Sequence, residues 1–178
     1  MVAEPPMIAT MLTGLPAYGP AAISFPAPNA FREGVVVRFM PERGQPWIGN
    51  FARGIGGVTA LRPELGARSI IVAASGAGYV VNAEARQLVC ETRCAVKSIR
   101  YEDDLGLVVV SDGLSFEALS KTGVAWLSGR VSWDGMRNVR RQGARLEGEA
   151  YSPIEDEWSP FTLDLRNGNF TSGVYSGP

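Results

Sequence analysis

Short apolar runs separated by turn residues dominate the chain from residue 35 onward. They are rich in Val, Ile and aromatic residues, as in "GVVVRFM", "SIIVAAS", "GYVVNA", "LGLVVVS" and "LSFEALS". Runs of about four to six such residues, bounded by Gly, Asp, Asn or Pro, are typical of β-strands. No window carries the i, i+3, i+4, i+7 spacing of an amphipathic helix, and 21 glycines disfavour helices. The pattern predicts an all-β protein.

The first thirty residues differ from the rest in composition. They hold six of the 12 prolines and few charges. Because proline fixes φ and removes a backbone donor, we expect an extended arm or irregular cover over residues 1–30, with at most a short strand at "AAISF". Residues 31–178 are expected to form one β domain built from repeated units.

An internal repeat is visible in the β region. "GVTALRPELGARSIIVAASGAGYVVNAEARQLV" and "AVKSIRYEDDLGLVVVSDGLSFEALSKTGVAWL" both read as a short strand, a polar turn, an aliphatic strand and an aromatic-led strand. Ile70 matches Leu107 and Tyr79 matches Phe116, in each case 37 residues apart. A third copy places Leu146 a further 39 residues on. The repeats predict antiparallel meanders of about 40 residues each.

A second alignment supports the same period. "PWIGNFARGIGGVTAL" matches "AWLSGRVSWDGMRNV", which pairs Trp47 with Trp126 and Gly57 with Gly135, 79 and 78 residues apart. These offsets correspond to two units of the shorter period.

The units "VTALRPELGARSIIVAASGAGYVVNAEARQLV" and "VKSIRYEDDLGLVVVSDGLSFEALSKTG" resemble WD-type and related β-propeller repeats, over residues 20–175. The resemblance implies a small or partial propeller-like fold that binds along a channel or across one face. The chain departs from that family in having no Gly-His at the start of any unit. In "GRVSWDG", moreover, Trp133 and Asp134 precede the opening strand of a unit instead of ending a third strand.

Three architectures fit these meanders. The first is a compact four-unit propeller, and the second is a β-sandwich. The third is an open half-ring completed by a second copy of the chain, which implies a homodimer, since exposed sheet faces and edges are normally avoided.

Composition excludes several classes of chemistry. The chain has no histidine, so a Ser-His-Asp or Cys-His mechanism and a His-containing zinc site are ruled out within one chain. Cys90 and Cys94 are too few for a four-thiolate zinc site. We expect two reduced, partly buried thiols, with a disulfide across a tight turn as the alternative. No cofactor, metal or catalytic residue is assigned.

Charge and hydropathy limit the partners. The formal net charge of −1 gives no general attraction to nucleic acid or to an anionic membrane. No stretch approaches the roughly 20 apolar residues of a membrane helix, and no basic residue precedes Arg32, as a secretory signal requires. Only Lys97 and Lys121 accompany the arginines among 17 basic residues, a bias typical of GC-rich genomes. We therefore expect a bacterial, cytoplasmic protein.

Two acidic clusters contain the side chains best suited to catalysis. They occur in "YEDDLG" and "PIEDEW", each between predicted strands. We interpret both as solvated hairpin turns, because acidic turns are routine there. A metal site and paired carboxylates for glycoside hydrolysis are the alternatives. The residues concerned are Glu102, Asp103, Asp104, Glu155, Asp156 and Glu157.

Five arginines lie within sixteen residues: Arg130, Arg137, Arg140, Arg141 and Arg145. Because alternate residues of a strand share a face, we expect Arg137 and Arg141 to point away from Arg140. A solvated edge strand is the favoured interpretation, since charge on an edge discourages unwanted pairing. A surface for an acidic partner is the alternative.

The tryptophans are the residues most apt to form a binding hot spot. Their recurrence in the repeat favours core packing over a ligand site. In "WDG" we expect Trp133 to pack while Asp134 and Gly135 supply turn chemistry. As candidate binding residues we name Trp133, Asp134, Arg137, Arg141 and Trp158.

The sequence favours a protein-binding or interaction module, with an inhibitor or immunity-type protein as one example. One alternative is a hydrolase or lyase that uses carboxylates of the acidic turns. The other is a structural subunit that associates with itself. An enzyme is the less favoured class, because the usual catalytic residues are missing.

Overall fold

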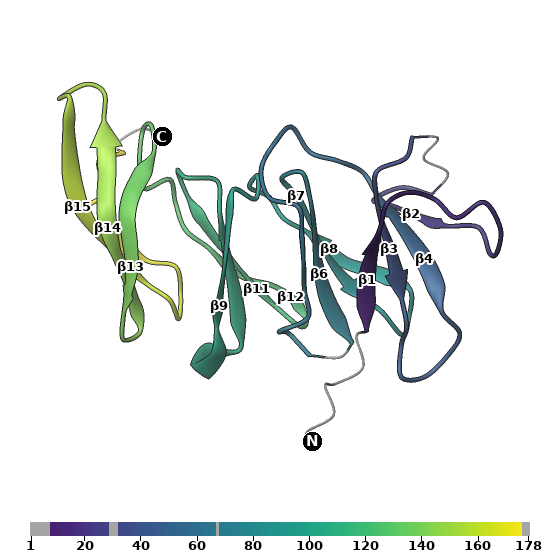
Figure 1. Ribbon diagram of the computed structural model, residues 1–178. Helices are drawn as coiled ribbons and strands as arrows, with labels where there is room; N and C mark the ends of the chain where they lie inside the picture. Colours follow the sequence, from purple (N-terminus) through teal and green to yellow (C-terminus); the bar gives the residue numbers. More distant parts are fainter. Residues whose placement is uncertain (1–7, 29–31, 67, 176–178) are drawn as a thin grey trace, which may run out of the picture. The chain divides into compact units, whose positions relative to one another are not determined.

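The computed structural model describes residues 8–28, 32–66 and 68–175 (Figure 1). Half of the described residues are in strands and 2% are in helix, so the all-β prediction is confirmed. The strands form four separate four-stranded sheets, which are mostly antiparallel and none of which closes into a barrel. Within the described residues no helix is long and apolar enough to cross a membrane.

Contacts divide the chain into two compact units, Met1–Thr92 and Arg93–Pro178, which we call the first and second unit. Each unit contains two of the sheets. The boundary between them lies far from the division after residue 30 that composition predicts. Two strands from the first thirty residues belong to the first sheet, as described next.

The first sheet has the order β1-β3-β4-β2 and comprises β1 (Ala9–Leu12), β2 (Ile23–Phe25), β3 (Val35–Phe39) and β4 (Trp47–Phe51). β2 is the short strand expected at "AAISF", and it pairs parallel to β4. β1 is not predicted by the sequence. It is a short run between prolines. It becomes a strand by pairing with β3, which lies more than twenty residues further along the chain.

The second sheet is a simple meander, β5-β6-β7-β8, made of β5 (Ala60–Arg62), β6 (Ser69–Ala74), β7 (Ala77–Asn82) and β8 (Gln87–Glu91). Every residue of β6 is buried, which accounts for its continuous aliphatic run. A strand that is covered on both faces favours apolar side chains at successive positions, as in residues 70–74.

The third sheet opens the second unit. Its order is β12-β11-β10-β9, from β9 (Ser98–Glu102), β10 (Leu107–Ser111), β11 (Phe116–Ser120) and β12 (Gly123–Leu127). A single 3-10 turn, η1 (Asp103–Leu105), joins β9 to β10. This turn contains Asp103 and Asp104 of the first acidic cluster, whereas Glu102 is the last residue of β9.

The fourth sheet has the order β13-β14-β15-β16 and comprises β13 (Met136–Gln142), β14 (Arg145–Ser152), β15 (Glu157–Asp164) and β16 (Phe170–Thr171). The arginine-rich strand β13 lies at an edge of the sheet, as expected from its charges. The hairpin between β14 and β15 contains the second acidic cluster.

A tryptophan joins the two sheets of each unit. The Trp47 indole N–H donates to the backbone oxygen of Ala83 at 2.8 Å, and Trp126 donates to that of Leu165 at 2.8 Å. Both acceptors follow the third strand of the neighbouring sheet. The two tryptophans paired by the sequence alignment therefore make equivalent contacts. Assignment to a propeller stays a prediction.

Candidate binding surface

The fourth sheet turns one face of β13, β14 and β15 away from the core. On β14, Glu147, Glu149 and Tyr151 alternate with residues of the buried face. Across the ladder, Glu149 lies opposite Arg137 of β13, and Tyr151 lies opposite Trp158 of β15. Residues that alternate along one strand and face each other across strands share a surface.

Four of these residues form what we call the aromatic–arginine cluster: Arg137, Glu149, Tyr151 and Trp158. The guanidinium carbon of Arg137 lies 4.2 Å from the centroid of the Trp158 ring. The Tyr151 ring is 5.1 Å from that of Trp158, with a 40° tilt. Trp158 and Tyr151 remain partly exposed. The cluster thus presents aromatic surface to solvent with a cation stacked on it.

Glu149 fixes the position of Arg137. Its two carboxylate oxygens accept from Nε and Nη2 of Arg137 at 3.0 and 3.2 Å. Asn138 donates a further hydrogen bond of 2.6 Å to the same carboxylate. These donors, Arg137 first and Asn138 second, lower the pKa of Glu149, so it stays ionised and keeps its hold on the arginine.

Tyr151 is held at its hydroxyl end. The phenol O–H donates to Oδ1 of Asp156 at 2.6 Å. This hydrogen bond raises the pKa of Tyr151, with smaller contributions from burial and from the charges of Asp156 and Asp134. Both rings of the cluster are therefore restrained, one by the arginine and the other by the acidic hairpin turn.

A β-bulge in β13 decides which arginines share this face. Arg137 pairs with Glu149, but the next regular pair is Arg140 with Glu147, so the register shifts between them. Asn138 takes a positive φ of 54° at the bulge. A bulge adds one residue to a strand and resets its alternation.

The expected distribution of the arginines was therefore wrong. Arg137 and Arg140 lie on the same face, because Glu149 and Glu147 are two residues apart on β14. Arg141 pairs with Leu146 and belongs to the opposite face. The extra residue at the bulge is the cause.

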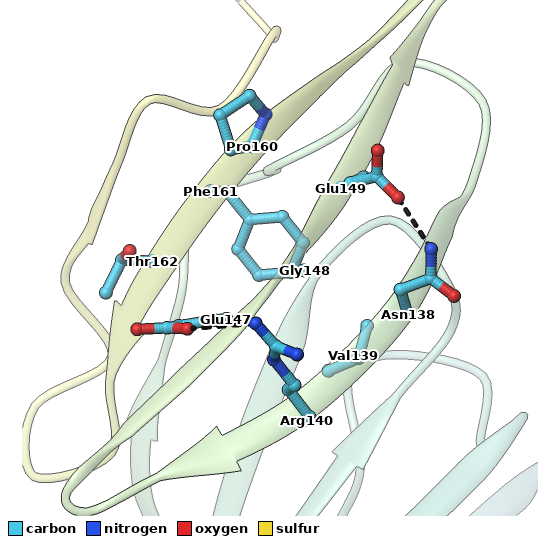
Figure 2. A pocket seen from close by; sticks show the side chains of 9 residues that line it. All are labelled: Asn138, Val139, Arg140, Glu147, Gly148, Glu149, Pro160, Phe161 and Thr162. Carbon is cyan, nitrogen blue, oxygen red and sulfur yellow. Dashed lines mark hydrogen bonds and ion pairs between the residues drawn. The ribbon is translucent and has the colours of Figure 1, made fainter.

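An open hollow of about 640 Å³ lies beside the cluster (Figure 2). Arg140 points toward Glu147, 3.8 Å away, and Asn138 points toward Glu149. Gly148 is one of the lining residues, and a Cβ there would lie 2.8 Å from the Phe161 ring. The full lining is Asn138, Val139, Arg140, Glu147, Gly148, Glu149, Pro160, Phe161 and Thr162.

Trp133 makes a separate contact. It lies in the loop before β13 and packs on Tyr175, with 4.5 Å between ring centroids. The Arg130 guanidinium stands over both rings, 4.9 Å from Tyr175 and 5.8 Å from Trp133. Arg130 also donates to the backbone oxygens of Ser132 and Trp133. These contacts fix the loop.

Asp134 is an exposed turn residue next to Gly135, whose φ of 105° favours glycine. The Gly135 carbonyl accepts from the backbone N–H of Tyr151 at 3.1 Å. The "WDG" stretch therefore forms a turn against β14. Asp134 acts on the cluster only through its charge on Tyr151.

Arg141 belongs to the first acidic cluster. It donates to both oxygens of Asp104 at 2.6 Å and pairs with Glu102 at 3.0 Å. Its guanidinium lowers the pKa of Asp104. The sequence predicts that this cluster is solvated. Glu102 is only 3% exposed, so the prediction is wrong for this residue. Arg141 therefore binds two of the six carboxylates that the sequence analysis names as candidates for catalysis.

The second acidic cluster has no metal-like geometry either. Asp156 accepts from Tyr151, and Glu157 accepts from Ser159 at 3.4 Å. Across the residues that the structure describes, no three His, Cys, Asp or Glu side chains gather in a way that could hold a metal ion.

Cys90 and Cys94 do not form a disulfide, and both are partly buried, as expected. Burial is the main cause that raises the pKa of Cys94 to about 12, and the nearby Glu117 adds to it. At neutral pH this thiol is protonated and a poor nucleophile.

Of the five candidate binding residues, Arg137 and Trp158 come together in the cluster. Asp134 lies at its margin, whereas Trp133 and Arg141 make other contacts. Sequence reasoning missed Glu149, Tyr151 and Asn138. The alternation in "LEGEAYS" places Glu149 and Tyr151 on one face and could have indicated both, but the bulge at Asn138 has no comparable signal.

Comparison with known proteins finds no family model that matches the chain and no match among curated proteins.

Proposed function

We propose that this chain is a protein-binding module of the bacterial cytoplasm, with the aromatic–arginine cluster and the adjoining hollow as its contact surface. The observation that carries the proposal is the stacking of Arg137 on the partly exposed Trp158, 4.2 Å apart, with Tyr151 beside it. An inhibitor or immunity-type protein is one example of this class.

The residue types support such a role. Trp, Tyr and Arg are enriched among the residues that contribute most to protein–protein affinity. Side chains that are already held in place lose little entropy on association. Here Glu149 and Asn138 hold the arginine, and Asp156 holds the tyrosine. A sheet face with pre-ordered, partly exposed aromatic side chains suits contact with another protein.

The charge environment supports binding over hydrolysis or lyase chemistry. A general acid must carry its proton near neutral pH. Arg141 lowers the pKa of Asp104, and Arg137 lowers the pKa of Glu149, so both carboxyls are ionised there. Arginine partners thus favour the anionic form at each of these positions.

The test is capture of a partner by tagged protein from a lysate of the source cell, with identification by mass spectrometry. We expect Trp158→Ala to weaken binding of the captured partner by at least about tenfold, measured with the purified pair. Tyr18→Ala is the control, because Tyr18 is 93% exposed and belongs to the first unit. This control should bind as the wild type does.

The same experiment separates the alternatives. Retention of full affinity by Trp158→Ala would contradict the proposed surface. Sedimentation at several concentrations tests self-association. A dimer that Trp158→Ala dissociates would instead assign the chain to the structural, self-associating class.

A further inference from the structure

A basic crevice lies between β9 and β13, the facing edge strands of the two sheets of the second unit. Its volume is about 360 Å³. Its lining residues include Lys97, Arg100 and Arg137 but no Asp or Glu. Ser98 adds a hydroxyl group.

Side-chain contacts hold the two strands next to each other. Arg100 of β9 donates to the backbone oxygen of Val139 in β13 at 3.0 Å. Further along, Arg141 of β13 binds Glu102 and Asp104. At this end Arg141 pairs with two carboxylates and so offsets only part of their negative charge. The crevice occupies the stretch toward the other end, where Lys97 and Arg137 lie.

The positive charge in the crevice exceeds the negative charge that faces it. Arg100 has a neutral carbonyl as its partner. Among the ion pairs between described residues, none involves Lys97 or Arg100, and only Arg137 has a carboxylate, Glu149. Arg100 is partly buried, whereas Lys97 and Arg137 are exposed. Positive charges gathered at a crevice, with fewer carboxylates beside them, attract an anion.

We infer that the crevice binds an acidic side chain of the partner protein. This inference rests on the proposed function and names the chemistry of the partner. The guanidinium of Arg100 and the ammonium of Lys97 supply charge-assisted donors for a carboxylate. Arg137 belongs to both the crevice and the aromatic–arginine cluster. A partner bound over Trp158 would therefore reach the crevice with an adjacent Asp or Glu.

The two lysines of the chain provide a matched pair of variants. Lys97→Glu reverses a charge in the crevice. Lys121→Glu makes the same change of net charge in the turn between β11 and β12, which lies across the third sheet from β9. Binding of a hexaglutamate peptide is measured by isothermal titration. We expect Lys97→Glu to weaken it by at least about tenfold and Lys121→Glu to change it by less than about twofold.

Inorganic phosphate is the second probe. If phosphate competes for the crevice as strongly as hexaglutamate does, the site takes small anions and the inference is overturned. Equal loss of hexaglutamate binding in both lysine variants would also overturn it, since that result reports net charge alone.

The captured partner distinguishes this inference from the proposed function. A partner whose binding needs Trp158 but is unchanged by Lys97→Glu overturns the crevice and leaves the function standing. A partner lost in Lys97→Glu but retained by Trp158→Ala supports the crevice and overturns the cluster as the main contact.

Discussion

The two units share a plan but differ in how many aromatic rings they pack into the core. In the first unit, five rings pack against one another inside the core: Phe25, Phe39, Trp47, Phe51 and Tyr79. In the second unit, Trp133, Tyr151 and Trp158 are partly exposed. The core of the second unit relies more on aliphatic residues such as Leu146, Leu163 and Leu165.

This difference supports the binding surface that we propose. Phe39 stacks on Trp47 at 4.2 Å and Phe25 on Phe51 at 5.0 Å, so these rings are committed to stability. Trp158 contributes to no core cluster and is held by surface residues. An ordered aromatic residue outside the core is a stronger indication of binding than one inside it.

The fourth strand of each unit's first sheet adds a second difference. β1, β3 and β4 correspond in order to β10, β11 and β12, with Trp47 and Trp126 on the equivalent strands. The remaining strand, β2, pairs beside β4, whereas β9 pairs beside β10 at the opposite edge. The position of β9 is what creates the basic crevice with β13.

The largest expected effect contrasts the two kinds of aromatic residue. Phe51→Ala removes a ring with no exposed surface and should lower the free energy of unfolding by about 3–5 kcal/mol. Trp158→Ala should lower it by about 1 kcal/mol or less, since that ring is partly exposed. Urea denaturation followed by circular dichroism measures both. Comparable losses in the two variants would refute the division into core and surface rings.

A smaller effect tests the equivalence of the two units. Trp47→Phe and Trp126→Phe each keep an aromatic ring but leave a backbone oxygen, that of Ala83 or Leu165, without its indole donor. We expect each to cost about 1–3 kcal/mol, because the acceptor stays buried. Urea midpoints of the two variants should agree closely. A cost confined to one of them would show that the contacts differ in energy despite their geometry.

The smallest effect concerns pH. Arg141 holds the pKa of Asp104 below its ordinary value of 3.8. Because the pKa of Asp104 is lowered in the folded state, the ion pair stabilises the fold at pH values above the ordinary pKa. This stabilisation is lost as the pH falls through the lowered pKa. Arg141→Met should therefore lower the urea midpoint at about pH 7 and should differ less from the wild type at about pH 2.5.

Arg140→Met is the control for this pH effect. Its ion pair with Glu147 is longer, 3.8 Å, and largely exposed. We expect a nearly pH-independent difference from the wild type. A pH dependence as large as that of Arg141→Met would contradict the assignment to Asp104.

Much of the fold was predictable where local pattern and burial agree. β6 and β10 were predicted from their aliphatic runs. Both runs are largely buried in the structure, so local pattern and tertiary environment agree. The Trp47–Trp126 alignment indicated two residues that make the same contact. β1 was missed because a short run between prolines becomes a strand only when β3 lies beside it.

The candidate site was predicted in part. Arg137 and Trp158 were named, since their residue types favour binding. The expected arginine face was wrong, because a bulge shifts the alternation by one residue and leaves no mark in the hydrophobic pattern. The role of Arg141 depends on Glu102 and Asp104, which lie 39 and 37 residues away along the chain.

The sequence by itself determined the strand class and the absence of histidine chemistry, because alternation, turn residues and composition are local properties. Only the tertiary structure decided which aromatic rings lie inside and which outside. It also decided which arginines meet carboxylates and which leave a crevice positive. Those outcomes depend on strand order and register, which are set by contacts between residues far apart in the chain.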